Sequence, residues 1–209
     1  MIPSSTPSTD LRRVTVALAG NPNSGKTTLF NALTGARQHV ANYPGVTVET
    51  KYGRRRHHGM EITFVDLPGT YSLTAYSVDE VVARDYIIEE KPDVVIHVID
   101  ATNFERNLYL TTQLMELGVP LVIALNMSDE AEKNGTMINR PLIKKFLEIP
   151  AVRTIGSKGE GLDELLRAAL TEAETSPHHE HAVGYGDRIE RYIADIVAEI
   201  EGDPKLSVR

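Results

Sequence analysis

The chain has 209 residues, of which 41% are hydrophobic and 24% charged, and these values are typical of one globular domain with an appendage. The net charge of −7 disfavours a dedicated nucleic-acid-binding protein, and the absence of cysteine excludes disulfides and thiolate metal sites. No stretch approaches the ~18 consecutive apolar residues of a membrane span, and the Ser/Thr/Pro-rich start lacks the apolar core of a signal peptide. We therefore expect a soluble polypeptide with a disordered tail over residues 1–12.

The first predicted elements are a buried strand over Val14 to Ala19 and a helix over Thr28 to Leu33 that ends at Gly35. Between them, residues 20–27 fit the phosphate-binding P-loop pattern G-x-x-x-x-G-K-[ST], in the strand–loop–helix context that the pattern requires. The residues expected to contact a nucleotide here are Gly20, Asn21, Pro22, Asn23, Ser24, Gly25, Lys26, Thr27 and Thr28. The Lys26 ammonium suits the β- and γ-phosphates, and the Thr27 hydroxyl is placed to ligate Mg²⁺.

A polar stretch over Ala36 to Gly45 is predicted to be irregular and to lead into a hairpin, with strands over Val46 to Tyr52 and Met60 to Val65. The tip, Gly53 to Gly59, carries three arginines and two histidines. A solvated turn is the favoured interpretation, and contact with an anion or a nucleic acid is the alternative. Thr47 lies where this irregular stretch meets the hairpin and can offer a second hydroxyl to Mg²⁺ when a γ-phosphate is present, which would order that loop.

The four residues Asp66, Leu67, Pro68 and Gly69 follow the second hairpin strand. An aspartate at this strand end can hold a water molecule on Mg²⁺, and the Gly69 N–H can meet a γ-phosphate. Together, Thr27, Thr47 and Asp66 would form a sensor of the nucleotide state.

The rest of the chain alternates helices and buried strands. Helices are predicted over Asp79 to Glu90, with Ser77 and Glu80 as a capping box, and over Arg106 to Leu117, Pro141 to Leu147 and Leu162 to Ala173. Strands are predicted over Val94 to Ile99, Leu121 to Leu125 and Ala151 to Ile155, with a polar loop over 130–139. This alternation predicts an α/β fold over residues 13–174, with a mostly parallel sheet of six or seven strands and helices on both faces.

The guanine-recognition candidate is Asn126-Met127-Ser128-Asp129, at the end of the strand that precedes the 130–139 loop. The Asp129 carboxylate can accept hydrogen bonds from guanine N1–H and N2–H₂ together. It would select guanine over adenine because adenine leaves a buried carboxylate unpaired.

Residues 175–209 are predicted to be a linker followed by part of a helical domain. Ile189, Ile193, Ile196 and Ile200 form an amphipathic stripe that must be buried against another surface. The cluster His178-His179-Glu180-His181 has metal-ligand chemistry, but a solvated linker is the favoured interpretation because nothing nearby would fix these side chains.

The motifs together resemble a TRAFAC-class GTPase and, more narrowly, the intracellular Ras-like G domain of the bacterial ferrous iron transport protein B family. The specific matches are the P-loop, residues 42–49, residues 66–80, residues 103–111 and residues 126–129. The resemblance covers residues 14–172. It implies a G domain followed by a helical spacer and a membrane-embedded part, on the cytoplasmic face of the inner membrane, with GTP or GDP and Mg²⁺ as ligands and a homo-oligomer as a possibility.

The resemblance also assigns roles to residues that the local pattern leaves open. It implies that Gly45, Val46, Thr47, Val48 and Glu49 close on the nucleotide, and that Gly156, Ser157 and Lys158 support the guanine base, with a one-residue ambiguity. Related GTPases with an asparagine at the position of Asn23 bind K⁺ there. Thr70 stands where Ras-like GTPases have the glutamine that orients the attacking water, so intrinsic hydrolysis should be slow or should use other groups.

The favoured function is therefore a GTP-hydrolysing switch domain that serves ferrous iron uptake, with Lys26, Asn23, Thr47 and Gly69 as the residues nearest the reaction. Two alternatives stay open. A soluble GTPase of ribosome or RNA assembly shares the generic motifs but should carry a basic appendage, and the tail here is acidic. A nucleotide sensor that does not hydrolyse GTP is suggested by Thr70.

Overall fold

The computed structural model describes residues 12–35, 38–43 and 47–175. The predicted helical stripe and the histidine cluster of the tail lie outside the described residues, as do Gly45 and Val46. Arg12, which falls in the predicted disordered tail, is the first residue of a strand. Among the described residues no helix is long and apolar enough to cross a membrane.

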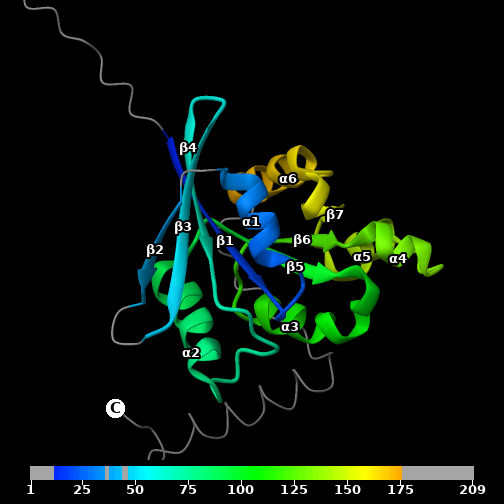
Figure 1. Ribbon diagram of the computed structural model, residues 1–209, viewed down its shortest axis with the longest axis horizontal. Coiled ribbons are helices and arrows are strands. Elements are labelled where there is room, and N and C mark those ends of the chain that lie inside the picture. The colour runs from blue at the N-terminus through cyan, green and yellow to red at the C-terminus, as the bar shows by residue number, and fades with distance from the viewer. Residues whose placement is uncertain (1–11, 36–37, 44–46, 176–209) are drawn as a thin grey trace, which may run out of the picture.

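One sheet of seven strands forms the centre of the described domain (Figure 1). The strands are β1 (Arg12–Gly20), β2 (Gln38–Asn42), β3 (Glu49–His57), β4 (Met60–Asp66), β5 (Val94–Asp100), β6 (Leu121–Asn126) and β7 (Ala151–Arg153). Their order across the sheet is β2-β3-β4-β1-β5-β6-β7. Neighbours from β4 to β7 are parallel, and β3 is antiparallel to both β2 and β4. The predicted fold class, a mostly parallel sheet with one antiparallel hairpin strand, is confirmed.

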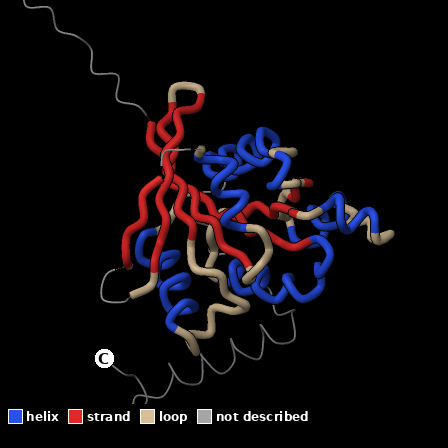
Figure 2. The backbone as a smooth tube through the Cα atoms, in the orientation of Figure 1, coloured by secondary structure: helices blue, strands red, loops and turns tan. Residues whose placement is uncertain are grey.

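Helices cover both faces of this sheet (Figure 2). They are α1 (Lys26–Thr34), α2 (Val78–Asp85), α3 (Phe104–Glu116), α4 (Ser128–Lys133), α5 (Arg140–Leu147) and α6 (Leu162–Thr175), with a π-helical turn, Tyr86–Glu90, directly after α2. The predicted capping box is present at the start of α2, where Ser77 accepts from the Glu80 backbone and Glu80 accepts from the Ser77 backbone.

Two apolar clusters lie on opposite faces of the sheet, because successive strand residues point to opposite sides. Val14, Val16 and Leu18 of β1 pack with α1 and α6. Ala17 and Ala19 of the same strand pack in the cluster that includes α2 and α3. In Figure 1, α1 and α6 are seen on one side of the sheet and α2 and α3 on the other.

Two segments predicted to be irregular are regular in the structure. Residues 38–42 form the edge strand β2, with His39 stacked on its cross-strand neighbour Tyr52 at 5.3 Å between ring centroids. Residues 128–133 form α4, which begins inside the predicted guanine motif and replaces the start of the predicted 130–139 loop. Neither segment has a continuous apolar face, so pairing with neighbours, and not local pattern, determines its structure.

The predicted basic tip is also mostly strand. β3 continues through Arg54, Arg55 and Arg56 to His57, and only His58 and Gly59 make the turn. Both turn residues have positive φ, 46° and 77°, which is the requirement of a two-residue type I′ turn. The hairpin is therefore longer and tighter than the sequence predicts.

Candidate functional site

Parallel strands bring Gly20 and three polar side chains to one edge of the sheet, at the carboxyl ends of the strands. Gly20 ends β1, Asp66 ends β4 beside Leu18, and Asn126 ends β6 beside Asp100 of β5. Ligands of open α/β sheets bind outside these ends. The predicted phosphate and guanine motifs consequently lie on the same side of the molecule.

Each of the two P-loop glycines lies too close to a different neighbouring residue to carry a side chain. A Cβ at Gly20 would lie 2.5 Å from the Val98 carbonyl oxygen, so no side chain fits there. Gly25 precedes α1 with a φ of 78°, and a Cβ there would lie 2.3 Å from the Asn126 Nδ2 atom. The loop reaches the helix N-terminus without side chains in the way, and its N–H groups can face an anion.

Lys26 and Thr27 both meet Asp66 beneath this loop. The Lys26 ammonium is ion-paired with Asp66 Oδ1, and the Thr27 hydroxyl donates to Asp66 Oδ2 at 2.9 Å. Lys26 is only 8% exposed and Asp66 only 5%. Lys26 is therefore part of a buried ion pair. The sequence pattern assigned Lys26 to the phosphates and did not predict this pairing.

Thr27 and Asp66 also fit a divalent cation. A hydroxyl and a carboxylate in mutual contact at the end of the P-loop are hard oxygen donors of the kind that Mg²⁺ takes, with substrate phosphates as its other ligands. Within the described ranges no group of three or more His, Asp or Glu residues could hold a metal ion alone. A magnesium ion here would depend on the nucleotide and on water for its remaining ligands.

The segment 66–70 crosses close to the P-loop. The Leu67 N–H donates to the Leu18 carbonyl and the Thr70 N–H to the Gly20 carbonyl, both at 3.1 Å. A Cβ at Gly69 would lie 3.3 Å from the backbone of Pro22. Gly69 thus lies against the P-loop, and Pro68 beside it is half-buried. The contact of the Gly69 N–H with a γ-phosphate stays a prediction.

Asn126 connects three segments that are far apart in the chain. Its Nδ2 donates to the Ser24 carbonyl and its Oδ1 accepts from the Gly156 N–H, each at 2.9 Å. Asn126 is 3% exposed, so both bonds are shielded from water. Sequence reasoning placed Asn126 in the guanine motif but did not predict that it bonds to the P-loop. The only sign of this contact in the sequence is Gly25, where a side chain would collide with Asn126.

The guanine motif turns sharply after Asn126. Met127 has a φ of 57° and leads into α4, while the Ser128 hydroxyl is anchored on the Leu125 carbonyl at 2.7 Å. Asp129 accepts from the Lys158 ammonium at 2.7 Å. This hydrogen bond, supported by the charge of Lys158, holds the pKa of Asp129 below its ordinary value. The loop placed at 156–158 does lie beside the motif, with Gly156 buried and Ser157 and Lys158 exposed.

Other predicted site residues have side chains that are exposed and unengaged. Asn23 is exposed with a φ of 66°, and Thr47 is exposed; neither side chain has a hydrogen-bond partner among the described residues. Thr28 and Glu49 are exposed, and the Val48 carbonyl accepts from the Tyr43 N–H at 3.0 Å. The structure does not bring Thr47 into contact with Thr27 or Asp66.

Two buried polar atoms of the P-loop were not predicted. Asn21 Oδ1 and Ser24 Oγ have no hydrogen-bond partner among the described residues, although Asn21 is 4% exposed and Ser24 1%. The Ser24 oxygen lies 3.0 Å from the place of a Cβ at Gly20. Both atoms belong to the loop that would surround a phosphate.

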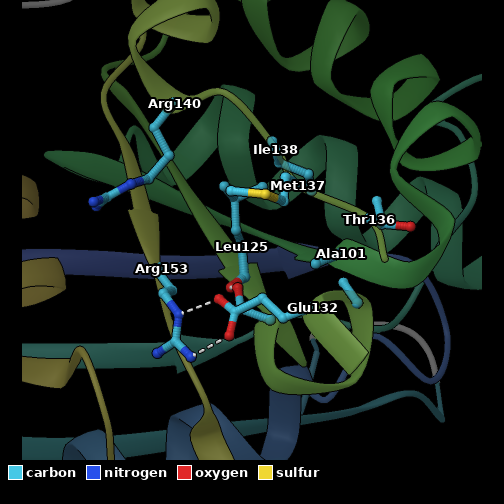
Figure 3. A pocket seen from close by; sticks show the side chains of 10 residues that line it. Ala101, Leu125, Glu132, Thr136, Met137, Ile138, Arg140 and Arg153 are labelled. Carbon is cyan, nitrogen blue, oxygen red and sulfur yellow. Dashed lines mark hydrogen bonds and ion pairs between the residues drawn. The ribbon is translucent and has the colours of Figure 1, made fainter. Parts of the chain in front are cut away.

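A cavity of about 320 Å³ lies behind the guanine motif (Figure 3). Ala101, Leu125, Met137 and Ile138 are among its apolar lining residues, and Arg153 pairs with Glu132 at its edge, at 2.6 and 2.9 Å. Arg153 also reaches Glu160 at 3.3 Å. These pairs fasten α4 and the 156–160 turn to β7, which supports both sides of the guanine motif.

Comparison with known proteins gives one consistent family. A family model described as ferrous iron transport protein B matches residues 14–169. The Fe(2+) transport protein A/Fe(2+) transporter FeoB fusion protein of Porphyromonas gingivalis is 46% identical over 196 residues, covering 92% of this chain and 23% of that protein. The Fe(2+) transporter FeoB of Salmonella typhimurium is 45% identical over 196 residues, covering 90% and 25%.

Solved structures give the same result. The cytosolic domain of the T. maritima FeoB iron transporter in a GDP form superposes with a TM-score of 0.82 at 44% identity, covering 95% of this chain and 78% of that one. The FeoB G domain from Methanococcus jannaschii gives a TM-score of 0.70 at 45% identity, covering 78% and 99%. The fold is therefore that of a P-loop GTPase, and the chain spans about a quarter of the length of these two curated relatives.

Proposed function

The chain belongs to the ferrous iron transport protein B family, and on that premise we propose that it is the GTP-binding and GTP-hydrolysing switch domain of a ferrous iron transporter. In the full-length protein it lies at the cytoplasmic face of the membrane and acts on the membrane-embedded part of the same transporter. The names of the two curated relatives, both Fe(2+) transporters, support the iron role.

One observation carries the GTPase proposal: the phosphate motif and the guanine motif are joined through the Asn126 side chain. A nucleotide that lies along this junction has its phosphates at the N-terminus of α1 and its base beside Asp129. Asp129 then accepts from guanine N1–H and N2–H₂, with the loop 156–158 behind the base.

The P-loop residues stabilise charge on the transferring phosphoryl group. Lys26 and the N–H groups before α1 provide fixed positive charge and dipoles there. Thr27 would ligate a bound Mg²⁺ directly and Asp66 would hold it through water, and the ion would supply charge that neutralises part of the phosphate charge. The Gly69 N–H and the Thr47 hydroxyl sense the γ-phosphate. Thr47 contacts neither Thr27 nor Asp66 in this structure, so it has to move toward them when the phosphate binds.

Hydrolysis is slow without a further cation, because Thr70 replaces the glutamine that orients water in Ras-like GTPases. Thr70 is 4% exposed, with its N–H bonded to the P-loop. The free amide oxygen of Asn23 is a hard ligand suited to K⁺ beside the β/γ bridge. Such an ion would occupy the region that an arginine finger reaches, and a finger is worth about 10³–10⁵ in rate; the gain from K⁺ is smaller because its charge is diffuse.

The potassium step has its own test. Single-turnover GTP hydrolysis should be faster in KCl than in NaCl at equal ionic strength, and Asn23→Ala should remove the difference. The Asn31→Ala variant is the matched control, since it removes the same kind of side chain from an exposed position of α1 outside the predicted site and should keep the difference. Equal rates in both salts for the unmodified protein would sink the potassium assignment and leave the GTPase proposal intact.

Two observations separate the main proposal from its alternatives. Phosphate release in a single turnover distinguishes an enzyme from a sensor that only binds GTP. A complete absence of phosphate release with GTP and Mg²⁺ would overturn the proposal that the domain hydrolyses GTP. An RNA-assembly GTPase would bind RNA tightly. Separate titrations of the protein with RNA and with GTP compare the two affinities. The family match favours the transporter over both alternatives.

A further inference from the structure

The turn of the β3–β4 hairpin projects beyond the helices (Figure 1). Among the described residues, β2 pairs with β3 only as far as Gly53, and residues 54–57 pair with β4 alone. Arg54, Arg56 and His58 are exposed, and Arg55 and His57 are half-buried. We define residues 54–58 as the basic hairpin tip.

The charge of this tip is largely unopposed. Among the described residues neither Arg54 nor Arg56 has an ion pair, and Arg55 donates only to the Leu33 carbonyl at 3.4 Å. Glu61, the cross-strand neighbour of Arg56, is engaged by Arg13 of β1 at 3.6 Å. In a chain with a net charge of −7, these arginines form a local surface of opposite sign.

The tip also lies where the described domain begins and ends. Arg12, at the start of β1, is in register with Met60, directly after the turn, and its guanidinium pairs with Glu174 in the last turn of α6 at 2.6 Å. The chain continues past Thr175, and the curated relatives continue much further, since this chain spans 23–25% of their length. The last described residues of α6 therefore lie beside the start of β1, at the same end of the sheet as the hairpin turn.

The nucleotide site lies at the carboxyl ends of the parallel strands, whereas the basic hairpin tip lies at their amino ends. These two ends of the sheet are about 26 Å apart, because β1 has nine residues at ~3.3 Å per residue. A flat surface that met the tip would leave the opening beside the P-loop free for nucleotide exchange. The acidic remainder of the domain would be repelled from an anionic surface, which favours this one orientation.

We propose that the basic hairpin tip docks the domain on the anionic headgroups of the membrane that holds the rest of the transporter. The inference rests on the proposed function for the nearness of a membrane. It rests on charge complementarity and on the position of Glu174, the end of α6, beside Arg12 for the choice of face. Arginines near an anionic leaflet each contribute to binding through the surface potential, which falls off within a Debye length.

Cosedimentation of the 209-residue protein with lipid vesicles tests the proposal. The protein should bind vesicles that contain phosphatidylglycerol and should not bind phosphatidylcholine alone, and high salt should release it. Arg54→Gln with Arg56→Gln should weaken binding about 25-fold, from roughly fivefold per cation removed. Arg54→Lys with Arg56→Lys should bind as the unmodified protein does, because only charge is needed.

The matched control is Lys144→Gln with Lys145→Gln, which removes the same charge from exposed positions of α5, against β7 at the other edge of the sheet. It should bind vesicles normally. Equal weakening in both double variants, equal binding to neutral vesicles, or no vesicle binding would overturn the proposal. So would binding to an RNA oligonucleotide, in place of vesicles, that the two arginine-to-glutamine changes abolish.

GTP hydrolysis in the same variants separates this proposal from the proposed function. The tip is remote from the P-loop, so Arg54→Gln with Arg56→Gln should hydrolyse GTP at the unmodified rate. Vesicle binding without any hydrolysis would count against the GTPase alone. If the variant aggregates but binds vesicles normally, the arginines only protect an open strand edge, and docking is refuted.

Discussion

The candidate site contains two ion pairs of opposite character. At the phosphate end, the side chains of Lys26 and Asp66 are 9% and 4% exposed and share their contact with Thr27. At the base end, those of Lys158 and Asp129 are 52% and 18% exposed. A buried pair leaves an uncompensated charge when one partner is removed, whereas an exposed pair contributes little. Phosphate binding is thus coupled to the stability of the fold, and base selection is not.

The strongest test of this difference is Lys26→Ala. GTP affinity should fall at least ~100-fold, because hydrogen bonds to charged groups contribute about 1.5–3 kcal/mol each and this lysine suits two phosphates. Lys158→Ala should lower affinity less than about tenfold. Titration of GTP into each folded variant measures both, and near-normal affinity of Lys26→Ala would remove this residue from the site.

At the base end, Asp129→Asn should change the preferred nucleotide. The amide can donate where the carboxylate only accepts, so guanine loses a paired acceptor and xanthine, with a carbonyl at that edge, gains a donor. The preference for GTP over XTP should shift by roughly 5- to 150-fold, the range of one bidentate contact. Competition between the two nucleotides decides it, and an unchanged GTP preference would mean that the guanine motif is misassigned.

Stability should divide the two pairs in the same way. Lys26→Met should lower the free energy of unfolding by about 2 kcal/mol, because it leaves a buried carboxylate without its cation. Among the described residues, the Asp66 side chain then keeps only its hydrogen bond from the Thr27 hydroxyl. Lys158→Met should change it by less than about 1 kcal/mol. Urea denaturation without nucleotide compares them, and equal losses would contradict the distinction between buried and exposed pairs.

The smallest expected effect is on the pH dependence of binding. Lys158 holds the pKa of Asp129 below its ordinary value, so the carboxylate stays ionised, and able to accept from guanine, as the pH falls toward that lowered pKa. Lys158→Met raises the pKa toward the ordinary ~3.9, and GTP affinity should begin to fall at a higher pH. Affinity measured from about pH 6 downward tests this, with Asp129→Asn as the variant that lacks the transition.

The sequence predicts the parts of the site that backbone geometry alone determines. The P-loop pattern requires glycine at positions 20 and 25 because a Cβ there would collide with Val98 or Asn126. The positions of these two glycines in the sequence therefore reflect contacts in the folded protein. The buried strands β5 and β6 are equally legible, since all but the last residue of β5 and every residue of β6 are buried.

Segments whose structure depends on distant partners could not be predicted. β2 is an exposed edge strand without an apolar face, and its pairing with β3 leaves no periodic signal. α4 is short and polar, and Arg153 fastens it through Glu132. The burial of Lys26 is likewise a property of the assembled sheet, because Asp66 lies 40 residues further along the chain.

The bonds of Asn126 have a consequence for synthesis on the ribosome. They join Ser24 to Gly156, positions separated by most of the domain, so the P-loop can emerge and turn into α1 long before its neighbours exist. Contacts between such distant residues form late, because the chain between them must first be closed. A nascent chain that ends before the 156–158 loop therefore holds a P-loop without its clamp, and tight GTP binding should begin only after that loop leaves the exit tunnel.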